Sequence, residues 1–276
     1  MIEDIEQIKK LMLTCDWQPV IKKIIGFIEK HFEQSRAKKI IIGLSGGIDS
    51  STTLALLVRS IGKENVMALV MPHYGITERE DLEDAYMVAD KFGVEYINIE
   101  LADICSNIKH RLSPFIEIDK KTYGNIIART RMIVLYAFSN SMNGIVAGTS
   151  DKSERTIGYF TKWGDAAADI FPIVDLYKTQ VREVARQLGV PNKIIMKPSS
   201  PGLWKGHLAE EEMGITYDKI DPILFAINEL KIPPEKVKEI DGIDPIEVDH
   251  VIGMIETSEH KKAYPYPKVQ DIIKGE

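Results

Sequence analysis

Cysteine is scarce in this chain, with only Cys15 and Cys105 among 276 residues. The two lie far apart and each falls within a helical pattern. We therefore expect two buried free thiols rather than a disulfide or a cysteine-based metal site. The scarcity also excludes a Cys-x-x-Cys pair and a cysteine nucleophile with a neighbouring histidine. The histidines are not spaced as a metal-binding set either.

Long apolar runs and a basic excess are also missing. No run is long enough to cross a membrane, and the opening MIEDIEQIKK lacks the profile of a signal peptide. The net charge of −6 argues against a general nucleic-acid binder. Hydrophobic residues at 44% and charged residues at 28% are typical of a chain that buries a sizeable core. We expect a cytoplasmic globular protein without membrane or nucleic-acid partners.

Strand-like and helix-like segments alternate over the first 150 residues. Short β-branched runs predict strands at 38–44, 65–72, 94–100 and 144–149. Apolar stripes predict helices between them at 51–62, 77–92, 101–112 and 122–142. This alternation predicts an α/β fold with a doubly wound, mostly parallel sheet. Two further helices are expected within 2–34, with Asp16 capping the second, and Thr77 with Glu80 forms a capping-box pattern.

The pattern changes beyond residue 150. Residues 155–172 are rich in Gly, Asp and aromatic residues without a clear period, which predicts a long functional loop. Helices are expected again at 175–188, 217–230 and 244–257. No repeat, low-complexity tract or flexible linker separates the halves. Residues 1–276 are therefore predicted to form one domain with helical N- and C-terminal elaborations.

The clearest chemical motif is SGGIDSS at residues 45–51, between a predicted strand and a predicted helix. Its glycines permit a tight turn, and its amides, hydroxyls and helix N-terminus together make an anion-binding nest. The motif is neither a Walker A loop nor a GxGxxG fingerprint. Asp49 beside bound phosphate would be repulsive unless it binds a divalent cation, so the loop predicts Mg²⁺. The alternative is a glycine-rich turn in which Asp49 caps the helix.

This loop resembles that of the ATP pyrophosphatases, which grip the β,γ-pyrophosphate of ATP and release AMP and pyrophosphate. GMP synthetase, asparagine synthetase, argininosuccinate synthetase and tRNA-thiolating enzymes share it, so the loop alone does not choose among them. A second series of motifs comprises GTSDKSE at 148–154, IGYFTKWGD at 157–165, LYKTQV at 176–181 and PSSPGLW at 198–204. In order and spacing this series is similar to the ammonia-dependent NAD synthetases, over residues 20–262.

The resemblance implies an adenine nucleotide alpha hydrolase-like fold and a set of site residues. ATP would contact Gly43, Leu44, Ser45, Gly46, Gly47, Ile48, Asp49, Ser50, Ser51, Thr149, Lys178 and Ser200. Deamido-NAD would contact Arg129, Lys162, Asp169, His260 and Lys261. Asp49 and Glu154 would hold Mg²⁺.

The resemblance also implies the reaction and the assembly. The nicotinate carboxylate of deamido-NAD would attack the α-phosphorus of ATP, and ammonia would then displace AMP, giving NAD, AMP and pyrophosphate. No side chain is needed as a covalent nucleophile. The chain has no candidate glutaminase residues, so free ammonia or ammonia from another protein is the expected nitrogen source. The family is dimeric, with the substrate site reaching the subunit interface.

The residue types agree with these roles, although each has a plainer alternative. Glu154 follows a strand end, where open α/β sheets place ligands, but it could be a solvated or capping residue. Lys178 could donate to phosphate or be an ordinary surface lysine. The donor fork of Arg129 suits a dinucleotide, although a helix-surface arginine is the alternative. Aromatic side chains that could stack on a ligand ring or pack in a core are Tyr159, Phe160 and Trp163.

The sequence departs from the family at two places. Ser200 stands where the family has threonine, so a hydroxyl is kept and a methyl lost. Ala166 and Ala167 stand where the family has Gly-Gly, and their methyl groups are expected to narrow the approach of the backbone to a ligand.

Two other functions stay open at this point. One is another ATP pyrophosphatase ligase of the GMP-synthetase or RNA-thiolating kind, and the missing Cys-x-x-Cys pair and basic segment count against thiolation. The other is a non-enzymatic adenine-nucleotide-binding protein. The pair of Asp49 and Glu154 counts against that alternative, because a pure binder has no leaving pyrophosphate to stabilise.

Overall fold

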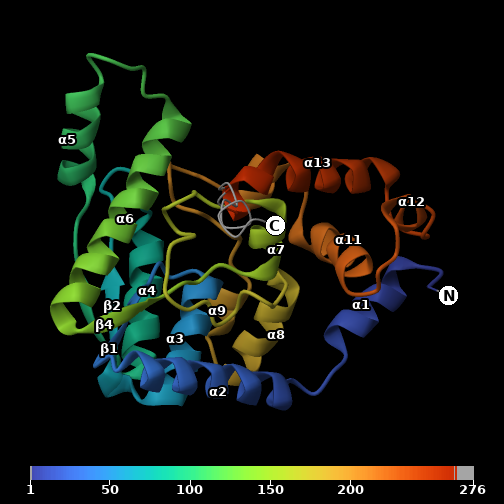
Figure 1. The fold of residues 1–276 in the computed structure, drawn as a ribbon, viewed down its shortest axis with the longest axis horizontal. Helices are drawn as coiled ribbons and strands as arrows, with labels where there is room; N and C mark the ends of the chain where they lie inside the picture. Colours follow the sequence, from blue (N-terminus) through green and yellow to red (C-terminus); the bar gives the residue numbers. More distant parts are fainter. Residues whose placement is uncertain (1, 264, 266–276) are drawn as a thin grey trace, which may run out of the picture.

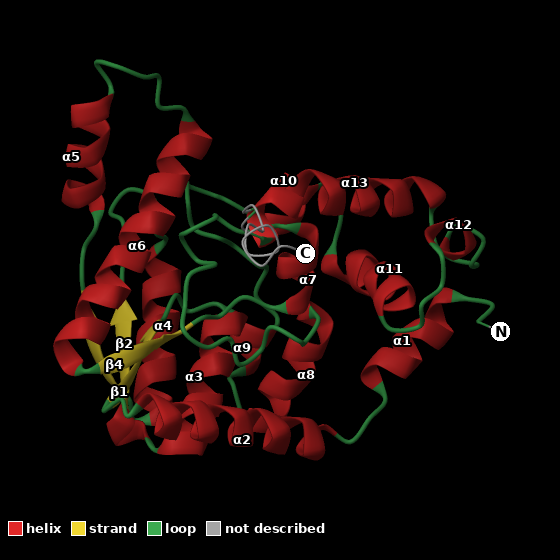
Figure 2. Ribbon diagram, viewed as in Figure 1, coloured by secondary structure: helices red, strands yellow, loops and turns green. Residues whose placement is uncertain are grey.

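A four-stranded parallel sheet occupies one half of the molecule (Figure 1; yellow in Figure 2). The computed structural model describes residues 2–263 and 265. The strands are β1 (Lys39–Gly43), β2 (Val66–Val70), β3 (Glu95–Asn98) and β4 (Gly144–Ala147). Their order across the sheet is β3-β2-β1-β4, and all three pairings are parallel. The predicted strands and their parallel pairing are confirmed.

Helices cover both faces of this sheet. Ile40 and Ile42 of β1 belong to one core and Ile41 to another, because successive side chains of a strand point to opposite faces. The helices packed on the first face are α2 (Trp17–Ser35), α3 (Ile48–Ile61), α4 (Arg79–Phe92), α8 (Lys178–Leu188) and α9 (Asn192–Ile195). Those on the second face are α5 (Ala102–Leu112) and α6 (Lys120–Met142). The doubly wound arrangement is therefore confirmed.

The N- and C-terminal elaborations pack together and share a core of their own, on the other side of the molecule in Figure 1. Its helices are α1 (Ile5–Leu13), α7 (Lys152–Ile157), α10 (Ala209–Met213), α11 (Tyr217–Asn228), α12 (Pro234–Val237) and α13 (Pro245–Lys262). Buried apolar residues from both ends of the chain, such as Ile8, Leu224 and Val251, belong to this core. The segment that follows β4 enters it through α7.

The predicted capping box at Thr77 and Glu80 does not form. Helix α4 begins at Arg79, and the structure gives its N-cap residue, Glu78, no side-chain capping bond. Thr77 Oγ1 instead accepts a hydrogen bond from the backbone N–H of His73 at 2.9 Å. Glu80 forms an ion pair with Lys193 at 3.1 Å. The capping prediction was wrong because the threonine hydroxyl is used to stabilise the turn before the helix.

The prediction for the cysteines holds at one of the two positions. Cys105 is buried in α5, but Cys15 is exposed in the short connection between α1 and α2, outside either helix. Both are free thiols. The neighbouring Asp16 caps α2 as predicted, accepting from the Gln18 N–H at 3.0 Å. Within the described part of the chain, no helix has the length and apolar character needed to cross a membrane.

Candidate active site

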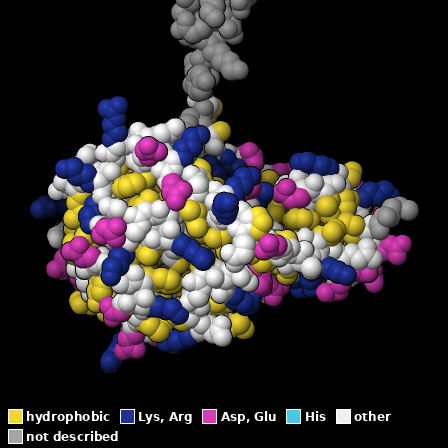
Figure 3. Space-filling view, turned by 90° about the horizontal axis from the view of Figure 1, so that it is seen from below, with side chains coloured by type: hydrophobic (Ala, Val, Ile, Leu, Met, Phe, Trp, Pro, Cys, Tyr) yellow, Lys and Arg dark blue, Asp and Glu magenta, His cyan; other side chains and the backbone are white. Residues whose placement is uncertain are grey.

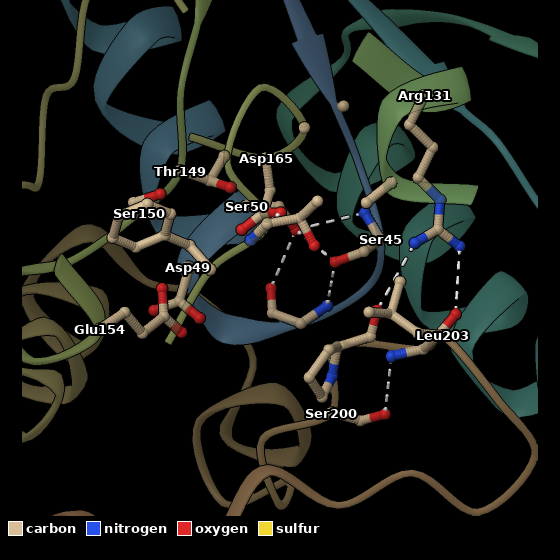
Figure 4. A pocket seen from close by; sticks show the side chains of 18 of the residues that line it. Ser45, Asp49, Ser50, Arg131, Thr149, Ser150, Glu154, Asp165, Ser200 and Leu203 are labelled. Atoms are coloured by element: carbon tan, nitrogen blue, oxygen red, sulfur yellow. Dashed lines mark hydrogen bonds between the residues drawn. The ribbon is translucent and has the colours of Figure 1, made fainter. Parts of the chain in front are cut away.

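A cavity of about 630 Å³ opens beyond the carboxyl ends of β1 and β4. The strand order explains its place. From β1 the chain proceeds to β2 and β3 on one side, whereas β4 lies on the other side of β1. Open α/β sheets bind ligands at such a switch point. Side chains from the loop after β1, from α6, from the segment after β4 and from residues 197–207 line the cavity (Figure 4).

The loop after β1 is built for a tight turn at the start of α3. Gly46 has φ +78°, and a Cβ there would lie 2.4 Å from the backbone oxygen of Asp81, so only glycine fits. The hydroxyls of Ser50 and Ser51 both donate to the backbone oxygen of Gly47, at 3.1 and 2.7 Å. Five residues of the motif line the cavity: Ser45, Gly47, Ile48, Asp49 and Ser50. Gly46 and Ser51 do not line it.

Lys178, the first residue of α8, lies at the centre of a cluster of carboxylates. Its side chain has no exposed surface, so the surface-lysine alternative is wrong. Its Nζ lies 2.7 Å from Asp49 Oδ2, 2.9 Å from Asp151 Oδ2 and 2.9 Å from Glu154 Oε1. Burial opposes the charged ammonium, but the carboxylates of Asp151, Asp49 and Glu154 outweigh it and raise the pKa of Lys178 well above its usual value.

The capping alternatives for Asp49 and Glu154 are wrong. Gly47 is the N-cap residue of α3, and Asp151 is the residue whose side chain caps α7. Asp49 and Glu154 contact Lys178 instead, and each side chain keeps 20% of its surface exposed. Burial, with the nearby Asp151 and Asp49, raises the pKa of Glu154 well above its usual value, although Lys178 opposes this. One ammonium thus faces three carboxylates, and a further cation would relieve their repulsion.

The pair of Asp49 and Glu154 fits a divalent cation. The two carboxylates are neighbours, because both contact the Lys178 Nζ, at 2.7 and 2.9 Å, and both line the cavity. The buried Asp49 Oδ1 receives no hydrogen bond from any described residue. Over residues 2–263 and 265, no three His, Cys, Asp or Glu side chains form a metal centre on their own. Mg²⁺ is commonly held by one or two carboxylates together with substrate phosphates and water, so the residues that would hold it here are Asp49 and Glu154.

Four of the five candidate substrate residues form one connected group on the cavity wall. The guanidinium of Arg129 donates to the backbone oxygen of Lys162 at 3.3 and 3.2 Å. Lys162 Nζ donates to the backbone oxygen of His260 at 2.7 Å. Lys261 Nζ donates to the backbone oxygen of Gly158 at 2.7 Å. The end of α13 is thereby fastened to the segment after α7, and all four residues line the cavity.

Other candidates are divided between the cavity and its surroundings. Asp169 does not line the cavity, because its carboxylate accepts from the Val146 N–H at 2.7 Å and the Tyr136 hydroxyl at 3.2 Å. Trp163 is not a core residue, since 47% of it is exposed. Gly43, Leu44, Thr149 and Ser200 line the cavity, as expected. Tyr159 and Phe160, for which a ligand site and a core were both open, also line it. Ala167, at the departure from the family glycines, also lies on the cavity wall.

Two residues of the site were missed from the sequence: Asp151, which is fully buried behind the cavity wall against Lys178, and Arg131, which lines the cavity. Asp151 stands three residues before Glu154, a spacing typical of helix N-termini that could have revealed it as a cap. Arg131 donates to the backbone oxygens of Pro201 and Gly202 at 3.4 Å each, across the cavity from α6 (Figure 4). Arg131 lies two positions after Arg129 on α6, and both residues line the cavity.

The tight turn before α3 and the carboxylate pair, placed at the switch point of a parallel sheet, belong to an adenine nucleotide alpha hydrolase-like fold. A family model described as NAD synthase matches residues 20–265. The chain belongs to the NAD synthase family.

Relatives and solved structures agree with this assignment. The chain is 47% identical over 257 residues to the NH3-dependent NAD+ synthetase of Staphylothermus marinus, covering 93% of each protein. It is 43% identical over 254 residues to that of Thermococcus kodakarensis, covering 92% of this chain and 98% of the relative. The structure of NMN synthetase from Francisella tularensis matches with TM-score 0.80 at 30% identity, covering 92% and 98%. An NH3-dependent NAD synthetase from Campylobacter jejuni matches with TM-score 0.76 at 29% identity, covering 92% and 99%.

Proposed function

We propose that this chain catalyses the ATP-dependent amidation of deamido-NAD by ammonia, giving NAD, AMP and pyrophosphate. The observation that carries the proposal is the cluster of Asp49, Glu154 and Lys178 beside the anion-binding loop, in a member of the NAD synthase family. A carboxylate is a poor acyl donor until its oxygen becomes a good leaving group. Transfer of AMP to the nicotinate carboxylate supplies that leaving group and explains the use of ATP.

The loop at 45–51 would hold the pyrophosphate portion of ATP. Its backbone amides and the N-terminus of α3 favour anionic oxygens, and Ser45 and Ser50 add hydroxyl groups. Binding there would keep the leaving group in line with the attacking carboxylate. Asp49 and Glu154 would hold Mg²⁺, which when bound neutralises charge that develops on pyrophosphate. Thr149 and Ser200, which line the cavity, would add further ATP contacts, whereas Lys178 does not line the cavity and would act on ATP through Asp49 and Glu154.

The basic group around Arg129 would receive deamido-NAD. Arg129, Lys162, His260 and Lys261 bring several donors to one wall of the cavity, and such donors suit the two phosphates of a dinucleotide. Asp169 would serve this site indirectly. Its hydrogen bonds at β4 fix the segment that leads from Ala167 toward α8.

Small molecules are the proposed partners, and the proposed location is the cytoplasm, where ATP and dinucleotides are available. The charge of −6 supports the absence of a nucleic-acid partner. On the face drawn in Figure 3, lysine and arginine side chains are interspersed with aspartate and glutamate rather than gathered in one basic area.

The reaction can be tested by product analysis. Purified protein with deamido-NAD, ATP, Mg²⁺ and ammonium is expected to form NAD and AMP in equal amounts, together with pyrophosphate, as measured by chromatography. Glutamine in place of ammonium is expected to give no NAD, because the chain offers no glutaminase nucleophile. Accumulation of ADP and orthophosphate would contradict the proposed chemistry.

A parallel incubation tests the substrate. Nicotinate mononucleotide replaces deamido-NAD under the same conditions, because the Francisella tularensis protein is an NMN synthetase. Deamido-NAD is expected to be the better substrate, since the basic group would contact both of its phosphates. Faster amidation of the mononucleotide would reassign the substrate while leaving the pyrophosphate-releasing chemistry in place.

We further propose that the chain forms a homodimer through the hairpin of α5 and α6, which projects from the body of the molecule in Figure 1. Three apolar side chains are exposed there: Phe115 by 83%, Ile116 by 51% and Ile133 by 58%. Light scattering is expected to give about twice the chain mass of 31.1 kDa. Phe115→Asp combined with Ile116→Asp is expected to give the monomer mass. The control is Leu11→Asp, at an exposed apolar position on α1; a monomeric wild type would contradict the proposal.

A further inference from the structure

A fully buried carboxylate, Asp221 of α11, lies behind the active site. Its Oδ1 accepts a hydrogen bond from Ser153 Oγ at 2.6 Å, and its Oδ2 accepts from the Thr179 N–H at 2.8 Å. Ser153 Oγ in turn accepts from the Lys178 N–H at 2.9 Å. A single polar network therefore joins α7, α8 and α11.

The network holds the backbone on both sides of the reactive cluster. Ser153 immediately precedes Glu154, and Thr179 immediately follows Lys178. The first N–H groups of a helix have no partner within the helix, and Ser153 and Asp221 provide acceptors for the first two of α8. The network thus joins the backbone that carries Glu154 to the backbone that carries Lys178. The side chains of these two residues meet, with Lys178 Nζ 2.9 Å from Glu154 Oε1.

The fold alone does not require a carboxylate at this position. Within the described part of the chain, no Lys, Arg or His nitrogen lies within ion-pair distance of Asp221. Burial raises the pKa of Asp221 to about 7, although the hydrogen bonds from Ser153 and Thr179 act in the opposite direction. A buried carboxylate without a cation costs stability, and such groups are retained mainly where they fix one arrangement of their neighbours.

We propose that Asp221 is a positioning residue for the ATP-dependent reaction, setting the separation of Glu154 and Lys178 through Ser153. This inference rests on the proposed function of those two residues. Carboxylate chemistry is essential to it, because only a group with two acceptor oxygens receives both the hydroxyl of Ser153 and the N–H of Thr179. Since α11 belongs to the second core, the terminal helices would help to form the catalytic site.

Asp221→Asn tests the proposal, because asparagine presents an NH₂ to one of the two donors. Its kcat is expected to fall about 10- to 100-fold, in the range that small displacements of catalytic groups cause. The KM for deamido-NAD is expected to change little, because the basic group around Arg129 does not contact this network. Ser153→Ala is expected to lower kcat similarly. The double variant is expected to have a kcat only slightly below that of either single variant, since both residues act through the same network.

Tyr177→Phe is the matched control. It removes a partly buried hydrogen bond at the same end of α8, from the Tyr177 hydroxyl to Glu229 at 3.0 Å, and leaves the network of Asp221, Ser153 and Thr179 in place. Its Tm is expected to fall without a loss of kcat. If Asp221→Asn does not fold, Ser153→Ala carries the test, because it keeps the contact between Asp221 and Thr179.

The outcomes separate the two proposals. Wild-type kcat in the folded Asp221→Asn or Ser153→Ala variant would overturn the role of Asp221, and so would losses that multiply in the double variant. Both results would leave the amidation reaction standing. A wild type that forms no NAD would refute the proposed function and this role together.

Discussion

Asp49→Asn and Glu154→Gln are each expected to keep the fold and to lower kcat by about 10²-fold or more, the usual cost of removing a group that stabilises charge in a transition state. Both substitutions preserve side-chain shape and remove one negative charge. The cluster holds three carboxylates around Lys178, so either variant leaves its ammonium with two partners. The expected change in Tm is accordingly small compared with the change in kcat.

The measurement is kcat over a Mg²⁺ titration, with Mn²⁺ affinity measured separately on the nucleotide-free protein. Both variants are expected to bind Mn²⁺ more weakly than the wild type. Asp175→Asn serves as control, because this carboxylate is 91% exposed and pairs with Lys152 rather than Lys178. Near-normal turnover at saturating Mg²⁺ in either folded variant would remove that residue from the metal site.

The main elements of the fold could be predicted because their patterns are local. A strand such as β1 needs only a β-branched run between polar ends, and a long helix such as α6 repeats its apolar stripe several times. The helices α7, α9, α10 and α12 were not predicted, since four to six residues are too few to show a helical period. The capping box at Thr77 failed for another reason: a contact with His73 competes for the same hydroxyl.

Some residues of the site could likewise be predicted from the sequence, and others could not. Asp49 and Glu154 each lie in the first turn of the helix that follows a strand, at the edge of the sheet where the topology places ligands, so their positions in the sequence point to the cavity. The burial of Lys178 could not be predicted, because a lysine is normally exposed and its partners come from two other segments. Asp221 lies 68 residues from Ser153, and no local pattern indicates that the two meet. Residues that act through such long-range contacts become visible only in the folded chain.

Lys178→Met is expected to lose most activity and also to destabilise the fold, unlike the two carboxylate variants. Methionine keeps an unbranched chain of similar length in the buried slot, so the lost charge is the main change. Removing one partner of a buried ionic cluster costs about 3–5 kcal/mol, since the remaining charges are left uncompensated. Here Asp49, Asp151 and Glu154 would face one another without a cation from the protein.

The pH dependence of stability makes this prediction specific. Burial already raises the pKa of Asp151 and of Glu154 while Lys178 opposes the shift, so loss of the lysine is expected to raise both further. A carboxyl whose folded pKa lies above its unfolded value stabilises the fold fully below the unfolded value, near 4, and this contribution is lost as pH rises through the folded pKa. Thermal unfolding of Lys178→Met is therefore expected to show a Tm deficit that is larger at pH 8 than at pH 5, and Mg²⁺ is expected to reduce the deficit at pH 8.

The control is Lys152→Met, which removes a partly exposed partner of Asp175 and Glu229. Its Tm deficit is expected to change neither with pH nor with Mg²⁺. A deficit of equal size at both pH values and insensitive to Mg²⁺ would mean that Lys178 stabilises the site by packing rather than by charge.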